Sequence, residues 1–396
     1  MPPNFDEIID RRGTHSSKWD MMEANYGVSA EDGIAMWVAD MDFRPPKVVQ
    51  DKLQSLIDHG VYGYFGDPSA TNAAVRWWMG ERFGWDIDEN WIHYTPGVVN
   101  GVAVVLHAFS QPGDGVVVMS PVYHAFGRVI RASGRKAVEC QLVNSAGRYE
   151  MDFESWDAQM TGNEKILLLC SPHNPGGRVW TREELRELGA FCRRHDLILV
   201  SDEIHQDLVF PGARFLPTDM ADEGLRERLI VLGATTKTFN IAGHLVGHAI
   251  IPDDGLRRKF SGTLRAMGIS PNAFGMHMIE AAYSPGGAQW ADELVTYLDG
   301  NRKILDTGLN AIPGVASMPL EATYLAWVDF GGTGMSHEEL LRRVEKEARI
   351  AVNHGPTFGK GGETFLRFNI GTPRANVEEA VARMHKAFAD LQCIAR

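Results

Sequence analysis

The stretch Leu229-Ile-Val-Leu-Gly-Ala-Thr-Thr-Lys-Thr-Phe-Asn-Ile-Ala-Gly243 sets a lysine shortly after a continuous apolar run. The run stops at Gly233 and predicts a strand that is buried on both faces. Two threonines then lead into Lys237 and a turn of small residues. Taken alone, a Thr-Lys-Thr triplet is most often a solvated loop. A lysine at the carboxyl end of a buried strand, however, lies where open α/β sheets bind ligands.

The rest of the chain alternates in the way that a parallel sheet requires. Four short apolar runs predict buried strands, at residues 115–119, 165–170, 197–200 and 229–232. Residues 181–195 between two of them predict a crossover helix, with Thr181 and Glu184 as a capping box. We therefore predict a large, doubly wound, mostly parallel α/β domain over residues 46–285.

The flanking segments predict a second, smaller unit. Residues 286–396 predict a small α+β domain with strands at 323–330 and 364–370, a helix from Gln289 to about Ala311 after a break at 284–287, and a closing helix capped by Asn376. Residues 1–45 are expected to form an N-terminal arm and part of that small domain. Two domains also suit a chain of 396 residues, which exceeds what one hydrophobic core usually supports.

Composition narrows the class of partner. The chain has 51 acidic and 39 basic side chains and no lysine or arginine tract, which argues against nucleic acid. No apolar run approaches the ~18 residues of a membrane span, and the first residues lack a signal-peptide pattern. The four cysteines are widely spaced and form neither a C-x-x-C pair nor a disulfide framework. We expect a cytoplasmic protein that acts on a small molecule, with no membrane contact and no metal site.

Polar residues follow three of the predicted strands, where their side chains would meet at one edge of the sheet. Asn174, Asp202 and Lys237 occupy these positions. Pyridoxal 5'-phosphate (PLP) needs such a set, because a lysine holds it as a Schiff base, a buried carboxylate keeps its ring nitrogen protonated, and an amide donates to its phenolic oxygen. Once substrate displaces Lys237, the freed amine can act as a general base.

Further residues complete the predicted cofactor site. Gly97, Val98 and Val99 open a predicted helix whose free N–H groups can bind a phosphate, together with the hydroxyl of Thr235. The Tyr123 ring would fix the plane of the cofactor. Each residue also has an ordinary structural reading, such as a strand brace for Asp202, a turn residue for Asn174 or core packing for Tyr123. Their joint occurrence at successive strand ends favours the catalytic interpretation.

The motifs resemble a known family, in order along nearly the whole chain. They are Trp-Val-Ala-Asp-Met-Asp-Phe (37–43), His-Gly-Val-Tyr-Gly-Tyr (59–64), Pro-His-Asn-Pro-Gly-Gly-Arg-Val-Trp (172–180), Ser-Asp-Glu-Ile-His (201–205), Thr-Lys-Thr-Phe-Asn-Ile-Ala-Gly (236–243) and Thr-Tyr-Leu-Ala-Trp (323–327). This pattern resembles the MalY/PatB branch of fold-type I PLP enzymes, which is related to class I aminotransferases. The resemblance implies a homodimer with shared active sites and a carbon–sulfur β-lyase activity on L-cystathionine or a related cysteine S-conjugate.

The resemblance also implies individual roles. Arg367 would bind the substrate carboxylate bidentately, and Ala39 and Asn174 would contact the substrate. Tyr64 would reach the phosphate from the second subunit, and His205 would lie near the phenolic oxygen of the cofactor. An aminotransferase is the nearest alternative activity, and a PLP-bound regulatory protein with low turnover is a second.

One histidine departs from the family pattern. His244 stands where a leucine is common after Ala-Gly, and it forms an i, i+4 pair with His248 if the stretch is helical. A metal site would lack a third ligand. We favour a locally hydrogen-bonded pair over a metal site, and His244 could also alter the substrate pocket.

Overall fold

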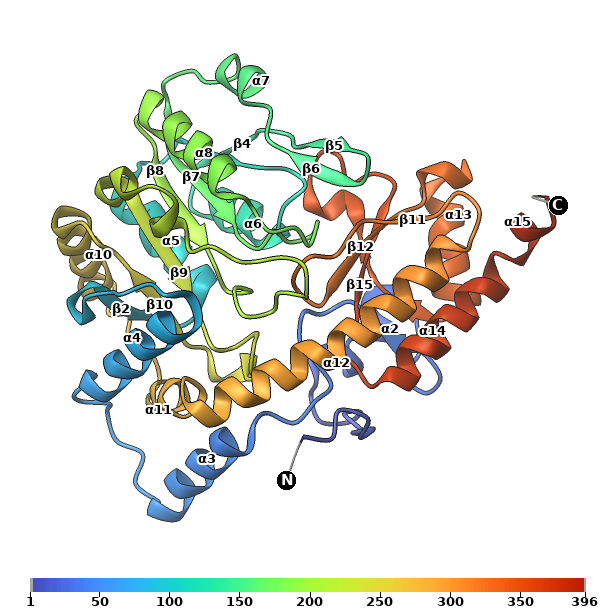
Figure 1. Cartoon of the computed structure of the whole chain (residues 1–396), viewed down its shortest axis with the longest axis horizontal. Coiled ribbons are helices and arrows are strands. Elements are labelled where there is room, and N and C mark those ends of the chain that lie inside the picture. The colour runs from blue at the N-terminus through green and yellow to red at the C-terminus, as the bar shows by residue number, and fades with distance from the viewer. Residues whose placement is uncertain (1–2, 395–396) are drawn as a thin grey trace.

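The computed structural model describes residues 3–394, and its centre is a seven-stranded sheet (Figure 1). The strand order is β2 (Ile92–Thr95), β10 (Gly247–Ile250), β9 (Leu229–Gly233), β8 (Ile198–Asp202), β7 (Glu164–Cys170), β3 (Gly115–Val118) and β4 (Lys136–Glu139). The pairs from β9 to β4 are parallel, and only β10 runs antiparallel to its two neighbours. This arrangement confirms the predicted α/β fold with a mostly parallel sheet.

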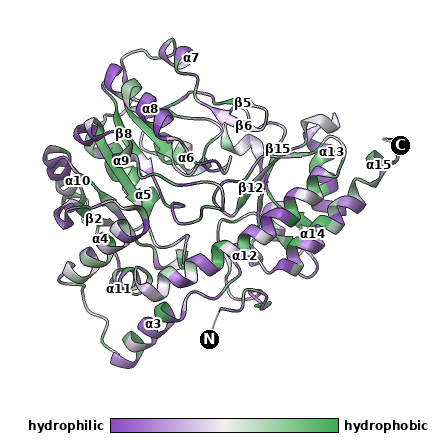
Figure 2. Cartoon of the chain, viewed as in Figure 1, coloured by the Kyte–Doolittle hydropathy of each residue, from purple (hydrophilic) through white to green (hydrophobic). Residues whose placement is uncertain are grey.

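Helices cover both faces of this sheet. One face packs against α5 (Val98–Phe109), α6 (His124–Ala132) and α10 (Asp254–Ala266). The other face packs against a larger core that includes α4 (Ser69–Phe83), α8 (Arg182–Arg194) and α11 (Ala273–Ala282). Leu168 contributes to the first core and its neighbours Leu167 and Leu169 to the second, because successive strand residues point to opposite faces. The strands are accordingly apolar along their length (Figure 2).

A second, four-stranded sheet lies to one side of the first. It is antiparallel, in the order β11 (Ala316–Ser317), β12 (Leu325–Asp329), β15 (Phe365–Asn369) and β14 (Asn353–His354). The long helix α12 (Pro285–Asn310) runs from α11 toward this sheet and packs there on α14 (Arg374–Ala387) (Figure 1). The two strands predicted in this part of the chain, around 323–330 and 364–370, are confirmed.

The first and last residues of the described chain join this second part. Helices α1 (Ser17–Asp20) and α2 (Met22–Tyr26) precede β1 (Ile34–Ala35), which pairs in parallel with β13 (Ile350–Ala351). The predicted domain boundaries at residues 46 and 286 stay predictions. The remaining elements are α3 (Lys47–His59), η1 (Glu89–Trp91), β5 (Val143–Ser145), β6 (Arg148–Glu150), α7 (Phe153–Asp157), α9 (Thr218–Ala221), η2 (Glu223–Arg228), η3 (Ala242–His244), η4 (Gly331–Thr333), α13 (His337–Leu341), η5 (Arg342–Glu347), η6 (Gly355–Phe358) and α15 (Ala389–Ile394).

Two predicted helix starts are wrong. Residues 284–287 are not a break before α12, because Ser284 accepts a hydrogen bond from the Gly287 N–H and Pro285 occupies the first turn, where its missing N–H does no harm. Asn376 does not cap the closing helix. Helix α14 begins at Arg374, and the Asn376 amide donates instead to the Thr372 hydroxyl at 2.8 Å.

The predicted pairing of His244 with His248 is also wrong. The short turn η3 ends at His244, and Leu245 follows with a φ of +45°, so no helix continues. His248 lies in β10, a strand that the sequence analysis missed. Neither ring nitrogen of His248 has a hydrogen-bond partner among the described residues, which contradicts the locally bonded pair.

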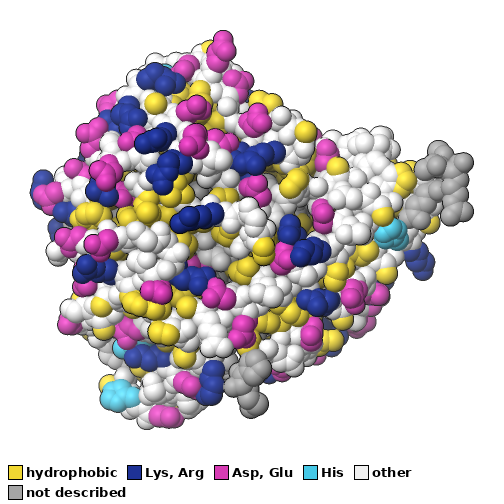
Figure 3. Space-filling model, viewed as in Figure 1, with side chains coloured by type: hydrophobic (Ala, Val, Ile, Leu, Met, Phe, Trp, Pro, Cys, Tyr) yellow, Lys and Arg dark blue, Asp and Glu magenta, His cyan; other side chains and the backbone are white. Residues whose placement is uncertain are grey.

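The surface carries both charges. Basic and acidic side chains are interspersed over the face shown in Figure 3, so neither sign dominates that face. Among the described helices, none is long and apolar enough to cross a membrane.

A buried ion pair ties the N-terminal segment to the chain near residue 42. Lys18 is fully buried, and its Nζ donates to Asp42 at 2.7 Å, while the Trp19 indole donates to the same carboxylate at 3.0 Å. Lys18→Met would leave the Asp42 carboxylate with Arg11 as its remaining cationic partner, at 2.9 Å. We expect the free energy of unfolding to fall by about 1.5–3 kcal/mol, the value of a hydrogen bond to a charged group. Urea unfolding measures this change.

Lys47→Met is the matched control for this substitution. Lys47 bonds Asp51 at 2.6 Å, but its side chain is 77% exposed. We expect its loss to lower the free energy of unfolding by less than about 1 kcal/mol. Equal effects of the two substitutions would contradict a structural role for the buried pair.

Candidate active site

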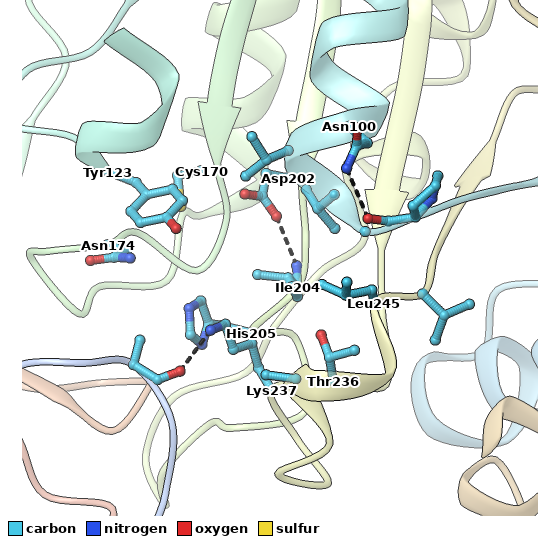
Figure 4. Close-up of a pocket in the computed structure, with 17 residues that line it drawn as sticks. Asn100, Tyr123, Cys170, Asn174, Asp202, Ile204, His205, Thr236, Lys237 and Leu245 are labelled. Carbon is cyan, nitrogen blue, oxygen red and sulfur yellow. Dashed lines mark hydrogen bonds between the residues drawn. The ribbon is translucent and has the colours of Figure 1, made fainter. Parts of the chain in front are cut away.

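A cavity of about 260 Å³ opens at the carboxyl ends of β7, β8 and β9 (Figure 4). Nine of the residues predicted from the sequence line it: Ala39, Gly97, Val98, Val99, Tyr123, Asn174, Asp202, His205 and Lys237. The strands bring Asn174, Asp202 and Lys237 together because parallel neighbours end at the same edge of the sheet.

Lys237 follows β9, and its amine reaches across the cavity toward the N-terminal segment. Its Nζ donates to the Ala39 carbonyl at 2.6 Å (Figure 4). The Tyr324 hydroxyl donates to the same oxygen at 2.9 Å. The pKa of Lys237 is lowered to about 8, chiefly by burial; Asp40 and Asp202 oppose this shift and Arg367 adds to it. Roughly a tenth of this amine is therefore neutral at pH 7, far more than for an ordinary lysine, and the neutral form is what a nucleophile or general base requires.

Asp202 is the last residue of β8 and is almost fully buried. Burial raises the pKa of Asp202 to about 7, against the effects of the Ile204 N–H at 3.2 Å and of the Lys237 ammonium. The structure thus holds a carboxylate in a place where its charge is poorly compensated. A cationic or protonated ligand group beside it would stabilise that charge.

His205 and Tyr123 flank the cavity on other sides. Burial lowers the pKa of His205 to about 3, with further contributions from Lys237 and Arg367, so the imidazole is neutral. Its Nδ1 is buried without a hydrogen-bond partner among the described residues. Burial also raises the pKa of Tyr123, which keeps its hydroxyl protonated.

The start of α5 provides N–H groups for an anion. Gly97 precedes the helix with a φ of +99°, a value that favours glycine, and the N–H groups of Val98 and Val99 lie in the first turn. Gly247 allows β10 to lie against this turn, because an added Cβ would come within 3.1 Å of the Val98 nitrogen. Thr236 lines the cavity beside these groups, whereas the predicted ligand Thr235 does not. The Thr235 Oγ1 is nonetheless buried and has no hydrogen-bond partner among the described residues.

Arg367 lies in β15, outside the residues that line the cavity, but it contacts one of them. Its guanidinium donates to the Asn174 side-chain oxygen at 2.9 Å, to the Trp37 carbonyl at 3.1 Å and to the Asn353 side chain. The guanidinium is buried, and burial lowers the pKa of Arg367 to about 10. The bond to its oxygen leaves the Asn174 NH₂ free to donate into the cavity.

Two predicted residues lie elsewhere. Tyr64 is fully exposed in the segment between α3 and α4, and it lines a separate groove with Tyr62 and Phe274. Within one protomer it does not contribute to the Lys237 cavity. His244 does not line the cavity either, although its neighbour Leu245 does.

The sequence analysis missed the residues that hold Ala39 in place. Asn369 donates to the carbonyls of Val38 and Asp40 at 2.6 Å each, and Asn240 donates to those of Met41 and Phe43. We call residues 37–43 the crossing segment. Its contacts join residues about 200 and 330 positions apart, and short-range sequence patterns carry no signal for them.

The described residues contain no group of three or more histidine, cysteine, aspartate or glutamate side chains that could hold a metal ion.

Comparison with known proteins identifies the family. The profile of aminotransferases of class I and II matches residues 35–384. The chain belongs to the class I and II aminotransferase family. Within this family, it is 39% identical to the cystathionine beta-lyase PatB of Bacillus subtilis over 389 residues, which cover 98% of this chain and 100% of PatB. It is 31% identical to the protein MalY of Escherichia coli, over 97% of this chain and 98% of MalY.

The structural comparison agrees with the sequence comparison. Cystalysin from Treponema denticola, whose crystal structure contains a PLP cofactor, matches with a TM-score of 0.94 and 35% identity. The match covers 99% of this chain and 100% of cystalysin. The resemblance to the MalY/PatB branch and the fold-type I architecture are therefore confirmed.

The raised pKa of Asp202 predicts a pH effect on the cofactor-free protein. The unfolded carboxyl titrates near ~3.9, whereas burial raises the folded pKa to about 7. The folded state keeps this proton longer, so stability falls as the pH rises between these two values. We expect Asp202→Asn to raise the free energy of unfolding by more than about 1 kcal/mol at pH 8 and by much less at pH 4.

Urea unfolding of the cofactor-free protein at both pH values measures this difference. Asp86→Asn is the control, because the Asp86 side chain is 85% exposed and we expect no gain that grows with pH. A gain from Asp202→Asn that is equal at pH 4 and pH 8 would contradict the desolvation of this carboxylate.

Proposed function

We propose that the protein is a PLP-dependent carbon–sulfur β-lyase. Its substrate is L-cystathionine or a related cysteine S-conjugate, and α,β-elimination releases a thiol, pyruvate and ammonia. The observation that carries the proposal is that Lys237, Asp202 and Asn174 line one cavity. Relatives such as PatB, a cystathionine beta-lyase that matches over its whole length, support the reaction type.

The residues of the cavity fit PLP. The phosphate suits the N–H groups of Val98 and Val99 in the first turn of α5, with Thr236 beside them. The Gly97 N–H already donates to the Thr95 carbonyl at 2.8 Å, and the unpartnered Thr235 hydroxyl lies outside the cavity lining. Asp202 suits the protonated ring nitrogen. The positive charge of that nitrogen would stabilise the buried Asp202 carboxylate, whose pKa is otherwise raised by burial. The free NH₂ of Asn174 suits the phenolic oxygen, and the neutral His205 lies nearby.

When bound, PLP supplies an electron sink that makes the Cα proton of an amino acid acidic. Lys237 would provide the amine that holds the cofactor covalently, and this amine would be free to act as a base once a substrate amine had taken its place. Because its pKa is lowered to about 8, the freed amine can accept the Cα proton at Nζ. The Ala39 carbonyl then accepts a hydrogen bond from the resulting ammonium.

Arg367 orients the substrate. Among the described residues, its buried guanidinium makes hydrogen bonds to neutral groups alone, so a substrate carboxylate would supply the missing negative charge. Bidentate binding there would direct the Cα proton toward one side of the cavity. Ala39 contributes to the same position from the crossing segment.

The aminotransferase alternative uses the same lysine, and the two activities differ in their need for a second substrate. The PLP-loaded protein is incubated with L-cystathionine, and pyruvate and free thiol are measured with and without a 2-oxo acid. We expect both products in equal amounts without the 2-oxo acid. Turnover that strictly requires the 2-oxo acid would assign an aminotransferase instead.

Lys237→Ala tests the proposed base. We expect the elimination rate to fall by at least about 100-fold, because a positioned general base contributes roughly 10²–10⁴ in rate. The visible absorbance of the lysine-bound cofactor should disappear as well. Lys259→Ala, on the surface helix α10, serves as a control and should leave both readouts unchanged.

The dimer with shared active sites is part of the same proposal. Segment 57–64 exposes several apolar side chains, with 50% exposure at Ile57, 70% at Val61 and 60% at Tyr62. An exposed apolar cluster of this kind marks an interaction surface. From this surface, Tyr64 of one subunit would reach the phosphate that is bound in the other subunit. The cytoplasm stays the predicted location, which the widely spaced cysteines support.

Mixed dimers test the shared site. Tyr64→Ala and Lys237→Ala proteins are each expected to be weakly active alone. After subunit exchange, hybrid dimers would contain one intact site, and activity should recover to roughly a quarter of the wild-type value because half of the dimers are hybrids. Absence of recovery, with hybrid dimers shown by mass spectrometry, would contradict the contribution of Tyr64 across the interface.

A further inference from the structure

A second cavity of about 190 Å³ adjoins the candidate active site. It lies between α6, β4 and the segment 356–359, and Tyr123 lines both this cavity and the Lys237 cavity. We call it the α6 cavity. None of the roles assigned above uses the other residues that line it.

Two buried polar groups of the α6 cavity lack partners. The Ser120 Oγ and the His124 Nδ1 are both buried, and neither has a hydrogen-bond partner among the described residues. Ser120 itself is fully buried. A buried hydroxyl without a hydrogen bond is destabilising, so a ligand that bonds it would gain that energy on binding.

Two charged side chains of opposite sign line the same cavity. Among the described residues, the exposed side chain of Arg131 makes no hydrogen bond or ion pair, and the Glu139 carboxylate bonds only the Lys360 N–H, at 3.0 Å. Burial lowers the pKa of His124 to about 4, so this ring is neutral. Gly127 leaves space for the guanidinium, because an added Cβ would lie 3.1 Å from an Arg131 nitrogen. One cation and one anion that do not pair with each other suit a zwitterion better than a simple anion.

One aromatic ring separates the α6 cavity from the proposed carboxylate site. The Phe358 ring lies 5.6 Å from the His124 ring, and the Arg367 guanidinium lies 4.9 Å from the centre of the Phe358 ring. The Val122 N–H donates to the Phe358 carbonyl at 2.8 Å, and this bond holds the backbone of Phe358 next to the residue that precedes Tyr123. The α6 cavity and the Lys237 cavity thus share Tyr123, and the Phe358 ring lies between the α6 cavity and Arg367.

We propose that the α6 cavity binds the amino-acid head group of the thiol that leaves. This inference rests on the proposed lyase function. Arg131 and the Ser120 hydroxyl bind the distal carboxylate, His124 donates from Nδ1, and Glu139 binds the distal ammonium. The enzyme is then selective for cysteine conjugates whose thiol part itself ends in an amino acid, as in L-cystathionine, over S-alkyl cysteines.

The test compares two substrates in three proteins. The kcat/KM for L-cystathionine and for S-ethyl-L-cysteine is measured in the wild type, in Arg131→Gln and in the control Arg128→Gln. Arg128 lies on the same helix, is exposed and lines neither cavity. We expect Arg131→Gln to lower kcat/KM for L-cystathionine by about tenfold or more, mostly through KM, since a hydrogen bond to a charged group is lost.

The same substitution should change kcat/KM for S-ethyl-L-cysteine by less than about twofold, because that substrate lacks the distal groups. The control should leave both values unchanged. An equal loss for both substrates in Arg131→Gln, or no loss for L-cystathionine, would overturn the assignment of the α6 cavity.

Failure of the proposed lyase function can be told apart from failure of the proposed subsite. If the wild type releases neither pyruvate nor thiol from either substrate, the proposed function fails. Calorimetric titration of the PLP-loaded protein with L-cystathionine then decides the inference by itself. Binding that is about tenfold weaker in Arg131→Gln than in the wild type would support the subsite, and equal affinity would overturn it.

Discussion

The candidate site depends on the hydrogen bond from the Lys237 amine to the Ala39 carbonyl, 2.6 Å long. Removal of this amine from water lowers its pKa to about 8, and the carbonyl gives the remaining charge one fixed acceptor. Lys237 comes from the end of β9, whereas Ala39 belongs to the crossing segment. The reactivity of the amine therefore depends on how accurately the chain holds a backbone carbonyl some 200 residues away in sequence.

Polar side chains from several parts of the fold provide that accuracy. Asn240 bonds the crossing segment from the same turn as Lys237, and Asn369 bonds it from β15, two residues after Arg367. The buried pair of Lys18 and Asp42 fixes its far end. A single short segment thus connects the lysine at the edge of the large sheet with the arginine of the small sheet. Arg367 in turn bonds Asn174, which lines the same cavity as Lys237.

The sequence was sufficient to predict the sheet and most of the cavity, because both follow local rules. Apolar runs mark buried strands, and Asn174, Asp202 and Lys237 follow them directly. The sequence was insufficient where contacts join residues far apart in the chain, or where a strand lacks a clear apolar pattern. Strand β10 begins with Gly247 and His248 and so lacks a continuous apolar run, and the sequence did not predict it. Asn369 and the α6 cavity, which joins Ser120 to Phe358, involve pairs that no periodicity relates.

The central claim is that Lys237 moves the Cα proton, and L-alanine isolates that step because it has no leaving group on Cβ. Proton NMR in D₂O measures how fast the PLP-loaded protein exchanges the Cα hydrogen of L-alanine for deuterium. We expect exchange by the wild type and a rate at least about 100-fold lower in Lys237→Ala. Exchange that is as fast in the variant as in the wild type would contradict the assignment of Lys237 as the base.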